Sequence, residues 1–81
     1  MEIMLFVKDD CPKCPAAIKE LEDFDGVIVY NIDEMNGFAE ASLHSVLATP
    51  SVLVLDSGGK EVGGWRGEIP SASDVRNLVA Q

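Results

Sequence analysis

The sequence predicts an α/β fold in which one four-stranded mixed sheet is flanked by helices. Apolar runs of strand length alternate with stretches in which apolar residues recur every three or four positions. The last two apolar runs are separated by a glycine-rich turn instead of a helix, which indicates an antiparallel hairpin. At 81 residues, the chain has the length of one small domain, residues 1–81. The expected order is β-α-β-α-β-β-α.

The first half of the chain predicts a strand, a helix and a parallel strand. The run from Ile3 to Val7 is apolar throughout, as is typical of a strand buried on both faces. A helix is expected from Cys14 to the Asp25-Gly26 pair, and residues 27–32 form a second strand after a βαβ crossover. The expected buried stripe of this helix is Ala17, Ile18, Leu21 and Phe24.

The second half predicts a helix, a hairpin and a final helix. The middle helix opens at Asn36-Gly37 and stops before Thr49-Pro50, because a residue that precedes proline avoids helical dihedrals. Its expected buried positions are Ala39, Leu43, Val46 and Leu47. Residues 51–55 and 60–62 are the hairpin strands. The last helix begins near Ser71 with a capping-box-like Asp74, and it is expected to bury Val75, Leu78 and Val79.

The composition excludes several classes of partner. Six basic and fourteen acidic residues give a net charge of −8, which repels nucleic acid and anionic membrane surfaces. The apolar run at the start of the sequence is too short for a signal peptide or a bilayer span. Two cysteines are fewer than a secreted, disulfide-stapled domain usually carries. We therefore expect a cytoplasmic monomer that binds neither nucleic acid nor membrane.

The two cysteines lie three positions apart, at the turn from the first strand to the first helix. In Cys11-Pro12-Lys13-Cys14, Cys11 is expected near the N-cap and Pro12 at the first helical position. The helix dipole and the free N–H groups of Lys13 and Cys14 would then lower the pKa of Cys11 and make it the nucleophile. Cys14 is expected on the inward stripe, where it would resolve a mixed disulfide.

Flanking charges act on the pair in both directions. Lys8 and Lys13 favour a Cys11 thiolate, whereas Asp9 and Asp10 oppose it, so the expected net lowering of the pKa is modest. The proposed chemistry requires no cofactor. Two other interpretations are an inert buried pair and half of a zinc site. Only His44 and carboxylates are left to complete a tetrahedral zinc site within one monomer, and redox chemistry is therefore favoured.

Three stretches carry a resemblance to a known superfamily. The C-P-K-C motif, preceded by Lys8 in a K-x-x-C pattern, is similar to the glutaredoxin active site. Residues 31–33, Asn-Ile-Asp, resemble a thioredoxin stretch, and Thr49-Pro50 stands where the superfamily places a cis-proline opposite the cysteines. The sequence resembles a minimal, glutaredoxin-sized member of the thioredoxin/glutaredoxin superfamily, with a thioredoxin-like fold.

This resemblance implies an enzyme, a thiol-disulfide oxidoreductase that reduces protein disulfides. Its catalytic residues would be Cys11 and Cys14, and its substrate-binding residues would be Pro12, Lys13, Thr49 and Pro50. Its partners would be a disulfide-containing client protein and a thiol or flavoprotein reductase that donates electrons.

The sequence also departs from the pattern of the superfamily. Gly63-Gly64 is typical of glutaredoxins, but Trp65-Arg66 follows where an acidic residue helps to hold glutathione. A glutathione-dependent glutaredoxin and a metal-binding or scaffold module that uses the thiolates are therefore the alternatives. Trp65 either docks a partner or packs over a sheet edge, while Arg66 is expected in a surface ion pair and His44 on the surface. The first strand lacks the buried aspartate that thioredoxins use as a proton relay.

Overall fold

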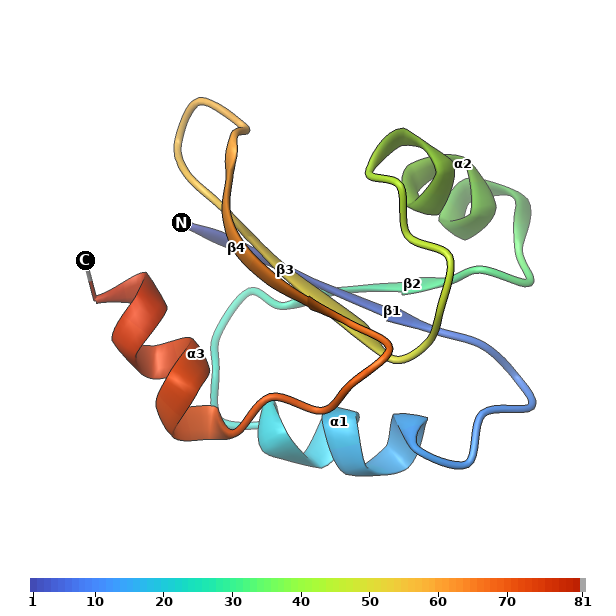
Figure 1. Cartoon of the computed structure of the whole chain (residues 1–81), viewed down its shortest axis with the longest axis horizontal. Coiled ribbons are helices and arrows are strands. Elements are labelled where there is room, and N and C mark those ends of the chain that lie inside the picture. Colours follow the sequence, from blue (N-terminus) through green and yellow to red (C-terminus); the bar gives the residue numbers. More distant parts are fainter. Residues whose placement is uncertain (81) are drawn as a thin grey trace.

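The structure is a computed structural model that describes residues 1–80 (Figure 1). Gln81, the last residue of the predicted domain 1–81, lies outside the described residues. The predicted element order is confirmed. The elements are β1 (Glu2–Val7), α1 (Cys14–Glu20), β2 (Ile28–Asn31), α2 (Met35–Leu43), β3 (Ser51–Leu55), β4 (Glu61–Arg66) and α3 (Ala72–Val79).

The four strands form one mixed sheet in the order β2-β1-β3-β4. The central strand β1 pairs in parallel with β2, where Leu5 faces Val29, and antiparallel with β3, where Leu5 faces Val52. Strands β3 and β4 form the predicted antiparallel hairpin. The two most apolar runs of the sequence, β1 and β3, therefore occupy the centre of the sheet, where both of their faces are covered.

Helices cover both faces of the sheet (Figure 1). Helices α1 and α3 lie on one face, and α2 lies on the other. Because neighbouring side chains of a strand point to opposite faces, Ile3 and Leu5 pack toward α1 and α3, whereas Met4 and Phe6 pack toward α2. The fold therefore has two apolar layers that share the central strands, and the turn that carries the cysteines leaves β1 at its carboxyl end.

The buried face of α2 differs from the predicted one. Ala39, Leu43 and Leu47 are exposed, and only Val46 of the predicted set is buried. The helix ends at Leu43 and not just before Thr49 as predicted, so Val46 and Leu47 lie beyond it. Gly37 and Ala41 face the sheet instead, and a Cβ atom at position 37 would overlap the backbone carbonyl of Asn31. The helix lies so close to β2 that its contact stripe consists of small residues, which a search for large apolar residues does not detect.

Two further helix predictions are corrected or refined. Ile18 of α1 is 47% exposed and not buried as predicted, while Ala17 and Leu21 are buried. The helix ends at Glu20, and a series of turns then leads to Gly26, whose φ of +73° favours glycine.

The capping prediction for α3 is confirmed, because the Ser71 side chain accepts a hydrogen bond of 3.0 Å from the Asp74 N–H. Val75 of this helix is buried, and Leu78 and Val79 are half-buried. Within residues 1–80, no helix has both the length and the apolar character that a membrane span requires.

Strand β4 is longer than the predicted residues 60–62. It continues through Gly63 and Gly64 to Arg66. A Cβ atom on Gly63 would overlap the Leu78 side chain of α3, and one on Gly64 would lie 2.8 Å from the side chain of Leu53. The glycine pair therefore has a packing role, because it lets α3 and β3 side chains approach the strand closely.

Candidate active site

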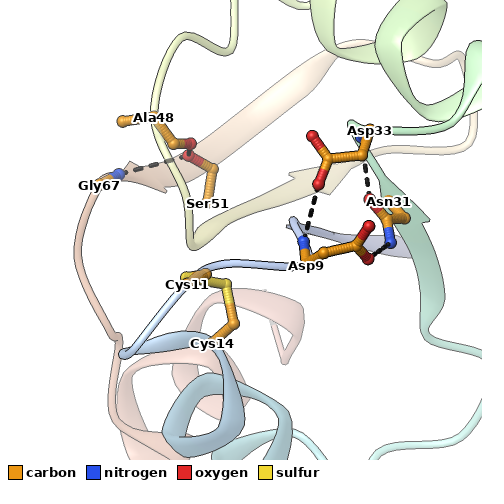
Figure 2. The surroundings of a disulfide bond; sticks show 8 residues. All are labelled: Asp9, Cys11, Cys14, Asn31, Asp33, Ala48, Ser51 and Gly67. Atoms are coloured by element: carbon orange, nitrogen blue, oxygen red, sulfur yellow. Dashed lines mark hydrogen bonds between the residues drawn. A yellow bond between two sulfur atoms is a disulfide. The ribbon is translucent and has the colours of Figure 1, made fainter.

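Cys11 and Cys14 are joined by a disulfide, with their Cα atoms 5.4 Å apart (Figure 2). Cys14 is the first residue of α1, and only 3% of it is exposed, since it shares the buried stripe of the helix with Ala17. Cys11 lies in the preceding turn and is partly exposed. Their relative exposure is the one expected of an attacking and a resolving thiol.

The start of α1 differs from the prediction. Lys13, not Cys11, is the N-cap, so that Pro12 lies in the turn before the helix and Pro15 lies in the first helical turn. The N–H of Cys14 donates to the carbonyl oxygen of Cys11 at 3.2 Å, which closes the turn. This N–H was expected to be free to stabilise a Cys11 thiolate. The sequence offers two prolines that both suit a first turn, and it does not by itself determine which of them is used.

A groove of about 450 Å³ opens beside the disulfide. It is lined by Lys8, Asp10, Cys11, Pro12, Lys13, Leu47, Ala48 and Thr49. Four of the six predicted site residues thus share one surface, although Thr49 is 38 positions from Cys11 in the sequence. Cys14 and Pro50 are buried and lie outside the lining of the groove.

The wall of the groove opposite the cysteines is a loop that hydrogen bonds hold in place (Figure 2). The Thr49–Pro50 peptide bond is cis, as the resemblance implied. The buried hydroxyl of Ser51 donates to the carbonyl of Ala48 at 2.6 Å. The N–H of Gly67 donates to the carbonyl of Pro50 at 2.9 Å and to the Ser51 hydroxyl at 3.3 Å. Sequence reasoning missed Ser51, because it reads as an ordinary first residue of a strand.

A second network connects the cysteine-bearing turn with the loop after β2 (Figure 2). The N–H of Asp9 donates to the Asp33 carboxylate at 2.8 Å, and the Asn31 side-chain amide donates to the Asp9 carboxylate at 2.7 Å. The N–H of Asp33 in turn donates to the Asn31 side-chain oxygen at 2.9 Å. Asp9 follows β1, Asn31 ends β2 and Asp33 follows it, and the carboxyl ends of these two parallel strands lie side by side. That topology is the signal that could have revealed the network.

Arg66 connects three segments. Its guanidinium donates to both carboxylate oxygens of Glu61, at 2.9 and 2.8 Å, and to the backbone carbonyl of His44 at 2.8 Å. The predicted ion pair of Arg66 is therefore confirmed. The hydrogen bond from Arg66 lowers the pKa of Glu61, and the same bond raises the pKa of Arg66.

The structure shows how far His44 and Trp65 are buried, which the sequence left open. His44 was predicted on the surface, but 17% of its side chain is exposed, and its ring centroid lies 6.5 Å from that of Phe6. Trp65 is half-buried and packs against the apolar layer under α1 and α3, which favours packing over docking for this residue. Within residues 1–80, no three His, Cys, Asp or Glu side chains are grouped closely enough to hold a metal ion.

Comparison with known proteins was made by sequence and by structure. No protein-family model matches the sequence, and no curated protein sequence matches it. Thioredoxin 1 from Thermosipho africanus superimposes with a TM-score of 0.76 at 25% identity, over 99% of this chain and 91% of that one. An uncharacterised thioredoxin-like protein from Clostridium perfringens gives 0.79 at 19% identity, over 98% and 68% of the two chains. A thioredoxin from Thermus thermophilus gives 0.66 at 25% identity, over 98% and 71%.

The chain has a thioredoxin-like fold, as its residues predicted. Its solved neighbours are thioredoxins and thioredoxin-like proteins, and its two cysteines form a disulfide at the turn between β1 and α1. Together these findings support a thiol-disulfide redox function in general.

Proposed function

We propose that this protein is a thiol-disulfide oxidoreductase that reduces protein disulfides, with Cys11 as the nucleophile and Cys14 as the resolving thiol. One observation carries the proposal. The two cysteines are close enough to form a disulfide, yet only Cys11 lines an open groove, whereas Cys14 is 3% exposed. A client sulfur can therefore reach Cys11 directly, whereas Cys14 is buried and within bonding reach of Cys11.

The proposed reaction has two exchange steps. The Cys11 thiolate attacks one sulfur of the client disulfide, which forms a mixed disulfide and expels the other client sulfur as a thiolate. Cys14 then attacks the Cys11 sulfur, so that the mixed disulfide breaks and the second client sulfur leaves, which takes up the Cys14 proton. Two electrons pass from the dithiol to the client. The Cys11–Cys14 disulfide is the product, and a thiol or flavoprotein reductase must reduce it again.

Substrate contacts are proposed at the walls of the groove. Pro12 and Lys13 form one wall, and Thr49 forms part of the other. Pro50, the next residue after Thr49, is buried and does not line the groove. An extended client segment would lie between the walls and bind mainly through its backbone, as in strand addition. We further propose that the protein acts as a cytoplasmic monomer, because a lone pair of close cysteines suits a reducing compartment.

The glutathione-dependent alternative loses part of its support. The Gly63-Gly64 pair that favoured it lies inside β4, where the Leu78 and Leu53 side chains pack closely against it, so the pair has a packing role that needs no ligand. The guanidinium of Arg66 is bound to Glu61 and to the His44 carbonyl, so it is not directed at a ligand. The structure therefore supports a glutathione-specific site less well than a site for protein disulfides.

The test is turnover of a protein disulfide, such as insulin, with a small dithiol as the electron donor. We expect the wild-type protein to accelerate the reduction and Cys11→Ser to return the rate to the background of the dithiol alone. Glutathione with its reductase should support much slower turnover. Metal analysis of the purified protein tests the scaffold alternative: one ion bound per two chains, together with no disulfide reduction, would overturn the proposal.

A further inference from the structure

An apolar groove on the α2 side of the molecule has no role in the chemistry described above. It has a volume of about 500 Å³ and is lined by Ile32, Phe38, Ala41, Ser42, Ser45, Val46 and Leu47. Phe38 is 65% exposed and Leu47 is 95% exposed, although side chains of this kind are usually turned inward. The groove thus has large apolar walls that nothing within residues 1–80 covers.

This apolar groove shares one lining residue with the groove beside the disulfide. Leu47 lines both of them, and Ala48 and Thr49 continue directly from Leu47 toward Cys11. A client chain held in a mixed disulfide at Cys11 would contact the first groove, and residues 47–49 connect that groove with the second one. Two hydrogen bonds hold the 44–51 segment in place. The Ser51 hydroxyl donates to the Ala48 carbonyl, and Arg66 donates to the His44 carbonyl.

The segments that frame this apolar groove carry acidic residues. Asp33, Glu34 and Glu40 lie on these segments. Arg66, which binds the His44 carbonyl, is already paired with Glu61. The His44 imidazole lies 3.7 Å from the Glu40 carboxylate. A segment that carries basic residues beside its apolar ones is therefore attracted, and an acidic segment is repelled.

We propose that the groove between Phe38 and Leu47 docks the segment of a client protein that flanks its disulfide, and that it selects segments combining a large apolar side chain with basic residues. This proposal rests on the proposed function and names its substrate class. The redox groove binds backbone and carries little sequence preference, whereas the apolar groove adds selection among clients.

Two cyclic disulfide peptides with lysine-rich flanks provide the test, one with leucine and one with serine in the flanking segment. We expect the wild-type protein to reduce the leucine peptide with a kcat/KM about fivefold higher, since a partly buried leucine side chain contributes at this scale. Phe38→Ser and Leu47→Ser should abolish the preference. The matched control is Leu43→Ser, and it should retain the preference. Leu43 is 74% exposed and lies on α2, as Phe38 does, but it does not line the groove.

Replacing the lysines of the peptides by glutamates should slow their reduction, by a factor that shrinks as salt is added.

Cystine, which is too small to reach the α2 side, separates the two proposals. Wild type, Phe38→Ser and Leu43→Ser should reduce it equally, and failure of the wild type to do so would count against the redox function itself. Binding would then be measured from NMR shifts of Phe38, Ala41 and Val46 during peptide titration, with the leucine peptide expected to bind tighter. The docking proposal would be overturned if Leu43→Ser lost the preference for the leucine peptide as fully as Phe38→Ser does. It would also be overturned if the wild type showed no such preference in turnover or in binding. Sedimentation showing a dimer that Leu47→Ser dissociates would also overturn it, because a second copy would then be the occupant.

Discussion

Cys14 is 3% exposed, whereas Cys11, whose Cα lies 5.4 Å away, faces an open groove. The first turn of α1 creates this difference, because Cys14 begins the helix and shares its buried stripe with Ala17 and Leu21. Two chemically identical thiols are thus given different access to solvent. The order of the exchange steps proposed above follows from that difference alone.

The two thiols should react at different rates once the disulfide is reduced. We expect iodoacetamide to modify Cys11 at least about tenfold faster than Cys14, because burial limits both ionisation and access. Cys14→Ser should accumulate a mixed disulfide with a client protein, and Cys11→Ser should not. Peptide mapping by mass spectrometry measures both results. Equal labelling of the two thiols in the folded protein would contradict the assigned roles.

Gly37 should be among the least replaceable residues of the fold. Gly37→Ala places a Cβ atom against the Asn31 backbone carbonyl, and backbone cannot rotate away as a side chain can. We expect it to lower the free energy of unfolding by about 2 kcal/mol or more. Gly58→Ala is the control, because its nearest neighbour is the flexible Asp56 carboxylate at 3.4 Å, and it should change stability by less than about 0.5 kcal/mol. Urea unfolding measures both, and similar midpoints for the two variants would show that α2 does not approach β2 so closely.

The Arg66–Glu61 pair should make stability depend on pH. The bond from Arg66 lowers the pKa of Glu61 in the folded state, so its stabilisation is present above the ordinary glutamate pKa and is lost as the pH falls through the lowered value. Glu61→Gln should therefore cost stability at neutral pH, by less than about 1 kcal/mol because both side chains are about one-third exposed. The difference from wild type should vanish in acid. Glu68→Gln, at another exposed glutamate, is the control, and a cost of Glu61→Gln that is independent of pH would contradict the pairing.

The Asp9–Asn31–Asp33 network should hold the two loops that meet beside the disulfide. Asn31→Ala removes the acceptor of the Asp33 N–H, and we expect the amide of Asp33 to exchange with solvent about tenfold faster. The Asp9 amide should follow, since its acceptor Asp33 is no longer held. Asn36→Ala, at an exposed residue of α2, should leave both amides unchanged. If exchange at Asp33 is the same in Asn31→Ala and wild type, the network does not order the loops.

The sequence indicated the strands better than the contacts of the helices. The apolar runs of β1 and β3 and the cap at Ser71 are local signals, and they predicted the observed elements and their order along the chain. The stripe of α2 could not be recognised, because Gly37 and Ala41 contact the sheet while Phe38, Leu43 and Leu47 are exposed. Such an inversion depends on how closely the helix lies to β2, which is a tertiary property.

The candidate site divides in the same way. The cysteine pair and the cis-proline loop have motifs that could be recognised from the sequence. The Asp9–Asn31–Asp33 network and the Ser51 bonds join segments that lie far apart in the chain, and they become visible only when the sheet brings those segments together. Pro12 and Pro15 both suit the first turn of a helix, so the sequence alone does not give the start of α1. In the structure, Pro15 lies in the first turn and Pro12 lies before it.

The reduction potential of the Cys11–Cys14 couple tests the redox function most directly. The protein would be equilibrated in dithiol buffers of known potential, and its free thiols would be counted by alkylation and mass. We expect one two-electron transition below about −220 mV, in the range of cytosolic reductases. A potential above about −180 mV would instead indicate an oxidant or isomerase, and the absence of an intramolecular disulfide at every potential would contradict the proposed function.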